Sequence, residues 1–209
     1  PCCMKCSDPP GKAGCCRLAL GHPCCPWETP GLDEVEVQTA LEQDQPFYLT
    51  LGRPPGPELS PRLPGPALLE LSLHGQLTAL LDWVEGRGPW SLALTPLIPY
   101  LDDDLAELEQ RIEAAKARGC QRVLAGCLTV CSPQLEQYLR EQAPQDAHRV
   151  LELVKAGPPA DYRHRLYGLI RGLCDRHELP FAVWEWPFGG TPFNRFLASA
   201  KPCCRGPGL

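Results

Sequence analysis

The sequence has no excess of basic residues, no long apolar run and no visible leader. Lysine and arginine number 20 against 25 aspartate and glutamate, giving a net charge of −5, so no basic face indicates nucleic-acid binding. No apolar segment reaches the roughly 18 residues that a membrane-spanning helix needs. The first residues contain neither a basic n-region nor an apolar h-region, so a secretory signal is not indicated. These absences favour a cytoplasmic protein that is not embedded in a membrane.

Several common catalytic motifs are also missing. The sequence contains no Gly-rich phosphate loop, no nucleophile elbow and no His-Glu-x2-His helix. It begins at Pro1 without an initiator methionine, which indicates a processed chain, a trimmed one or a fragment. Its 209 residues suffice for one domain with a sizeable core and a short appendage.

Cysteine, by contrast, is abundant at one end of the chain. Seven of the 13 cysteines lie within the first 25 residues: Cys2, Cys3, Cys6, Cys15, Cys16, Cys24 and Cys25. Thiolates spaced as in Cys3-x2-Cys6 can converge on one ion, so the seven are candidate ligands for zinc or a 4Fe-4S cluster. Adjacent cysteines rarely ligate the same ion comfortably, and a non-native or disordered end is an equally good interpretation.

Three regions follow from composition and periodicity. They are a Cys-rich segment at 1–30, read as a loop module, an α/β domain at 31–187 and a Gly/Pro-rich tail at 188–209. Within the domain we expect strands at 46–52, 90–95, 121–126 and 180–186. We expect helices at 32–41, 68–85, 102–118, 134–142 and 161–177, and an extended loop at 53–66. About four parallel strand–helix units result, which make half of a TIM-type barrel or a small open sheet.

The carboxyl ends of these strands are where a parallel α/β fold binds ligands. Thr50, Arg53, Thr95 and Glu185 lie there and could bind a polar ligand. Capping of a loop is favoured for each residue taken singly, whereas their position at one edge favours a ligand site for the set. For the carboxylates at 102–104, capping of a helix N-terminus is favoured over cation binding. Three cysteines of the α/β region are expected to be small buried hydrophobes: Cys120, Cys127 and Cys174.

Residues 32–179 resemble the second half of radical S-adenosylmethionine proteins of the spore-photoproduct-lyase-like group. Four stretches carry the resemblance, with the sequences FYLTL (47–51), SPRLP (60–64), LTPLIPYLDD (94–103) and ARGCQRVLAG (117–126), followed by the helix near 161–179. The chain departs from the family at Ser60, where a glutamate is usual. It also lacks the cluster motif Cys-x3-Cys-x2-Cys and the length for the first three strand–helix units.

The resemblance implies a truncated or divergent radical enzyme, lyase-like if it is an enzyme. Its complete form would bind a 4Fe-4S cluster and S-adenosylmethionine. Thr50, Arg53, Arg62 and Thr95 would then line the cofactor side of the barrel, and the N-terminal cysteines would replace the missing cluster loop. Two alternatives stay open. One is a non-enzymatic scaffold with a zinc- or iron-binding module, and the other is an incomplete product whose open sheet edge is covered by a partner or a second copy.

Overall fold

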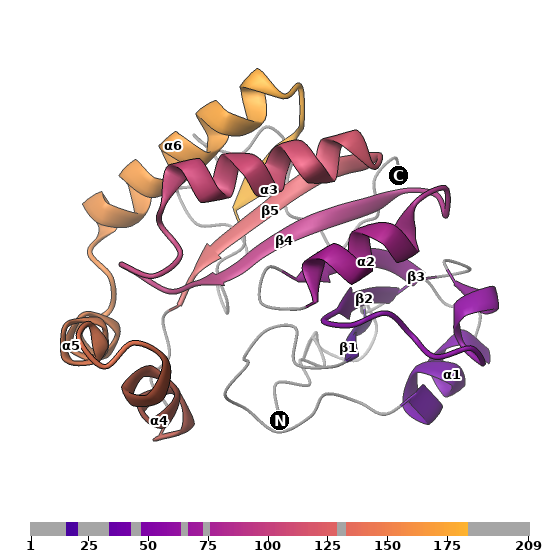
Figure 1. Cartoon of the computed structure of the whole chain (residues 1–209), viewed down its shortest axis with the longest axis horizontal. Coiled ribbons are helices and arrows are strands. Elements are labelled where there is room, and N and C mark those ends of the chain that lie inside the picture. The colour runs from indigo at the N-terminus through magenta and orange to yellow at the C-terminus, as the bar shows by residue number, and fades with distance from the viewer. Residues whose placement is uncertain are drawn as a thin grey trace, which may run out of the picture. The chain divides into compact units, whose positions relative to one another are not determined.

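The computed structural model describes residues 16–20, 34–42, 47–63, 67–72, 76–128 and 133–183. These residues form six strands that are hydrogen-bonded in the order β1-β2-β3-β4-β5-β6 (Figure 1). The strands are β1 Cys16–Leu20, β2 Phe47–Leu51, β3 Ala67–Ser72, β4 Trp90–Leu97, β5 Cys120–Cys127 and β6 Phe181–Val183. The recorded pairings β1–β2, β2–β3, β3–β4 and β5–β6 are all parallel. The chain therefore has the predicted α/β fold, built on an open parallel sheet.

The strand order has a topological consequence. Each strand lies beside the next one in the sequence, so every crossover moves along the sheet in the same direction. Because such crossovers are right-handed, the helices within each unit are expected on one face of that unit's strands. This is the arrangement of part of a TIM barrel, whereas a doubly wound sheet reverses its strand order at a switch point.

Six helices accompany the strands in the described part of the chain. They are α1 Glu34–Glu42, α2 Leu77–Val84, α3 Leu105–Ala117, α4 Pro133–Gln142, α5 Ala147–Ala156 and α6 Ala160–Arg176. Helix α3 ends where the sequence predicts, because Gly119 adopts a φ of 86° that favours glycine. None of these helices is long and apolar enough to cross a membrane.

The chain divides into two compact units. The first contains β1, β2, β3, α1, α2 and the start of β4 as far as Ala93, together with Arg118–Gln121. The second contains the rest of β4 from Leu94, then α3, the rest of β5 from Arg122, α4, α5, α6 and β6.

The first unit has an apolar core between helices and strands. Helix α1 contacts β1, and α2 contacts β3 (Figure 1). Leu80, Leu81 and Val84 of α2 are buried, as are Leu69 and Leu71 of β3. The backbone N–H of Gln76 donates to the carbonyl of Gly52 at 2.7 Å, which joins the start of α2 to the loop after β2.

The second unit is built around α3 and α6. These helices contact each other, and α6 contacts β6, while α4 and α5 form a hairpin in mutual contact. Between α3 and α6, Arg176 donates to Glu109 at 2.7 Å, and this contact, chiefly its hydrogen bond, lowers the pKa of the Glu109 carboxyl. The three side chains of β6 are fully buried, as expected for a parallel strand covered on both faces.

Three sequence predictions need correction. The helix expected at 68–85 is strand β3 followed by the shorter helix α2. The segment 1–30, expected to be loop, contains strand β1. The loop at 53–66 includes a short 3₁₀ turn at Ser60–Arg62, with Pro61 at its start.

Most of the predicted metal ligands lie outside the described residues: Cys2, Cys3, Cys6, Cys15, Cys24 and Cys25. For Cys16 the structure describes the backbone, as the first residue of β1. Glu185 and the tail at 188–209 also lie outside the described part.

Candidate functional site

A row of buried polar side chains crosses the sheet in the first unit. Thr50 of β2 is the register partner of Glu70 on β3, and Glu70 is the partner of Ser91 on β4. Register partners in a parallel sheet share a face, and Ser72 lies two residues beyond Glu70 on that same face. All four are buried, with exposed fractions of 2% for Thr50, 1% for Glu70, 0% for Ser72 and 7% for Ser91.

The face that carries this row is opposite the apolar face of β3. Leu69 and Leu71 alternate with Glu70 and Ser72, so the leucines project to the other side of the sheet. Helix α2 contacts β3 and buries apolar side chains, which only the leucine face can accommodate. The polar row therefore lies on the face of β3 opposite α2, which would be the inner face if the sheet were part of a barrel.

The centre of the row is a hydrogen bond between Thr50 and Glu70. The Thr50 Oγ1 hydroxyl donates to Glu70 Oε2 at 3.1 Å. A buried carboxylate is costly unless hydrogen-bond donors surround it, so sequences rarely place one in a strand interior without a reason. A buried carboxyl beside hydroxyl groups makes this row a candidate site for a polar ligand.

The four residues predicted to line a cofactor site have different surroundings. Thr50 belongs to the buried row, as described. Arg53 is half-buried and donates to the carbonyl of the next residue, Pro54, at 3.3 Å. Arg62 is exposed and forms an ion pair with Glu42 at 3.8 Å. Thr95 belongs to the second unit, is half-buried, and is joined to Pro96 by a cis peptide bond.

In the second unit, a network of polar contacts fixes the loop that follows β4. Asp102 accepts the backbone N–H of Ile98 at 2.7 Å, and Asp103 accepts the backbone N–H of Tyr100 at 3.2 Å. Tyr100 adopts a left-handed φ of 66°, which is uncommon for a residue other than glycine. The two carboxylates therefore hold an unfavourable turn in place.

Helix α6 reaches this loop through Tyr162. Its hydroxyl donates to Asp103 Oδ2 at 2.7 Å, and its ring lies 6.3 Å from that of Tyr100, tilted by 46°. Burial raises the pKa of the Tyr162 phenol well above its usual value, and the Asp103 carboxylate raises it further. Tyr162 is thus held as a neutral donor.

The end of β5 is fixed from the same helix. The backbone N–H of Cys127 donates to the hydroxyl of Tyr167 at 2.8 Å, and Tyr167 is fully buried. Cys120, Cys127 and Cys174 are buried and form no disulfide, which confirms their prediction as small buried residues.

The carboxylates at 102–104 act as backbone caps. Asp104 Oδ1 accepts the N–H groups of Ala106 and Glu107 at 2.8 and 3.1 Å, at the start of α3. This is the predicted helix N-cap. Among the residues that the structure describes, no group of three or more histidine, cysteine, aspartate or glutamate side chains can hold a metal ion.

Sequence reasoning missed Glu70 and the contacts of Tyr100 and Tyr162. Glu70 was placed in a helix, where a glutamate is ordinary. The signal that could have revealed it is a single carboxylate among leucines directly after Pro64-Gly65-Pro66, since prolines and glycine bound buried strands. Tyr100 and Tyr162 are 62 residues apart, and only the packing of α6 brings them together.

Comparisons with protein families, with curated proteins and with solved structures find no match to this chain.

Proposed function

We propose that this chain is the carboxyl-terminal part of a radical S-adenosylmethionine-type barrel and that its inner face binds S-adenosylmethionine. The buried pair of Glu70 and Thr50 is the observation that carries the proposal. The nucleoside and amino-acid parts of the ligand offer hydroxyl and ammonium donors, and a desolvated carboxylate forms strong hydrogen bonds with such groups. The sequential parallel strand order supports the barrel assignment.

An iron–sulfur cluster is held by cysteine thiolates. The described residues do not fit it, because no group of three suitable ligands exists among them. We therefore assign the described part of the chain to ligand binding, without a radical-generating step. The candidate cluster or zinc ligands remain the N-terminal cysteines, which lie outside the described residues.

We place the chain in the reducing environment of the cytoplasm, since the buried Cys120, Cys127 and Cys174 form no disulfide. We also propose that a second copy of the chain pairs with an end of the sheet, because β1 and β6 are the terminal strands of its described part.

Calorimetric titration of the full chain with S-adenosylmethionine tests the binding proposal. Glu70→Gln keeps the size of the side chain and removes its charge, and we expect it to weaken binding about tenfold, the worth of one charge-assisted hydrogen bond. Glu58→Gln is the matched control, because Glu58 is an exposed glutamate of the same unit. Its affinity should equal that of the wild type.

Two results would contradict the proposal. One is a wild-type chain that produces no binding heat. The other is a Glu70→Gln variant that melts at a lower temperature yet binds normally, which would make Glu70 purely structural.

Anaerobic reconstitution of the chain with iron and sulfide tests whether the N-terminal cysteines bind a cluster. A brown protein indicates a cluster, and a colourless one holding about one zinc per chain favours the non-enzymatic alternative.

A further inference from the structure

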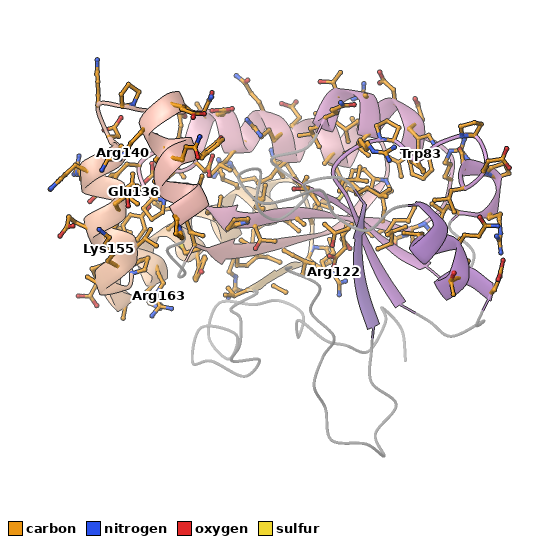
Figure 2. The ribbon with its side chains drawn as sticks, turned by 90° about the horizontal axis from the view of Figure 1, so that it is seen from below. Trp83, Arg122, Glu136, Arg140, Lys155 and Arg163 are labelled. Carbon is orange, nitrogen blue, oxygen red and sulfur yellow. The ribbon has the colours of Figure 1, made fainter. Side chains whose placement is uncertain are left out.

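Two arginine side chains stack on aromatic rings in the described part of the chain, and they differ in how they are held. Arg87 lies over Trp83 of α2, with its guanidinium carbon 4.8 Å from the ring centroid (Figure 2 labels Trp83). It also donates to the carbonyl of Trp83 at 2.7 Å and to the carbonyl of Ser60 at 3.2 Å. Trp83 itself donates to Ser60 Oγ at 2.9 Å. These hydrogen bonds hold Arg87 on the Trp83 ring, and they connect the 3₁₀ turn at Ser60–Arg62 to α2.

The second stack, between Arg149 and Tyr100, differs in how the arginine is held. Arg149 of α5 lies over the ring of Tyr100, with its guanidinium carbon only 3.7 Å from the centroid. The Arg149 side chain is exposed, and among the described residues no hydrogen bond or ion pair is recorded for its guanidinium. A stack of this kind at an exposed site is weak, so the side chain can leave the ring at little cost.

The aromatic rings beneath Arg149, by contrast, are held in place by hydrogen bonds. Tyr100 has a left-handed backbone that is fixed by the bond from its N–H to Asp103. The ring of Tyr162 stands beside it at a 46° tilt, anchored to the same Asp103 oxygen through its hydroxyl. Strained backbone that is held in place by its neighbours recurs at binding sites. Two fixed phenol rings and one carboxylate are the groups that recognise an organic cation.

We propose that Tyr100, Tyr162 and Asp103 form a binding site for an organic cation and that Arg149 occupies it in the free protein. The ligand class is a guanidinium, an alkylated ammonium or a sulfonium group, whose charge is diffuse and weakly hydrated. Such a ligand displaces Arg149 from the Tyr100 ring and takes over its cation–π contact. The site lies within the second unit and is distinct from the Glu70 row of the first.

Titration of the full chain with tetramethylammonium and with methylguanidinium, read by saturation-transfer NMR, tests this proposal. Arg149→Ala empties the site, and we expect it to bind both probes roughly two- to fivefold more tightly than the wild type, the worth of the displaced stack. Tyr100→Asn removes the ring while keeping a residue that tolerates a left-handed backbone, and it should abolish the binding.

Arg140→Ala is the matched control. Arg140 is an exposed arginine on α4, the other helix of the same hairpin, and it pairs with Glu136 of its own helix at 2.6 Å (Figure 2). This variant changes the net charge by the same amount and should bind the probes as the wild type does. The proposal is overturned if Arg149→Ala binds no more tightly than Arg140→Ala, or if Tyr100→Asn binds as well as Arg149→Ala. Circular dichroism of each variant establishes that the fold is retained.

Discussion

At the scale of single residues, the carboxylates of Glu70 and Asp103 each accept hydrogen bonds from neighbouring polar groups. Glu70 is 1% exposed and accepts the hydroxyl of Thr50, and Asp103 accepts both a backbone N–H and the Tyr162 hydroxyl. Each carboxylate joins segments distant in the sequence, with separations of 20 residues for Thr50 and Glu70 and 59 for Asp103 and Tyr162. Such contacts depend on the tertiary fold, and this is why sequence patterns do not reveal them.

The Tyr162 phenol should make the protein sensitive to alkali. Its pKa in the folded chain is raised above the ordinary value of 10.0, first by burial and then by Asp103. Above that ordinary value the unfolded chain loses the Tyr162 proton while the folded chain keeps it. The unfolded state then binds fewer protons, so the free energy of unfolding falls as the pH rises. Below pH 10.0 this contribution is fully present.

Replacement of Tyr162 by phenylalanine removes this dependence. We expect the fall in unfolding free energy between about pH 8 and pH 11 to be smaller in Tyr162→Phe, by up to about 1 kcal/mol. The side chain is only half-buried, and solvent screening keeps the difference below the full linkage value. Urea unfolding followed by circular dichroism at both pH values measures it. Equal losses in the two proteins would refute a raised pKa.

At the scale of elements, the sequence predicts helix α3 closely, whereas it does not predict strand β3 or helix α5. The helix expected at 102–118 corresponds to α3, Leu105–Ala117, because the Asp104 cap and Gly119 mark its two ends in the sequence. Strand β3 was missed since its leucines, together with those of α2, repeat at helical spacing. The alternation of Leu69 and Leu71 with Glu70 and Ser72 spans only four residues, and periodicity over so short a stretch does not distinguish a strand from the start of a helix. Pairing with β2 and β4 decides its structure, and that pairing is tertiary.

The Asp104 cap allows a test of how much one helix end contributes. Asp104→Ala removes the acceptor for the N–H groups of Ala106 and Glu107, and we expect it to lower the free energy of unfolding by about 1 kcal/mol. Asp104→Asn retains a side-chain oxygen at the same position and should cost much less. Chemical denaturation of the two variants compares them. Equal destabilisation would mean that the charge of Asp104, and not its hydrogen bonds, supports α3.

At the scale of the whole molecule, the strand order is the most informative feature, and the sequence indicated it only in part. Strand–helix alternation predicted parallel strands, yet two of the six, β1 and β3, were not expected. The sequential order makes β1 and β6 the terminal strands of the described sheet. Natural sheets protect such ends with charged residues, prolines or bulges. The residues of β6, Phe181-Ala182-Val183, include none of these.

An apolar strand at the end of the described sheet can pair with the same strand of a second copy of the chain. We therefore expect sedimentation velocity to reveal a reversible dimer that grows as the protein concentration increases, alongside a monomer of 23.0 kDa. Association through backbone hydrogen bonds should persist at high salt, whereas association through surface charges would weaken, since salt screens exposed charges. A single 23.0 kDa species at every concentration would contradict self-association and would leave a different partner to cover the edge.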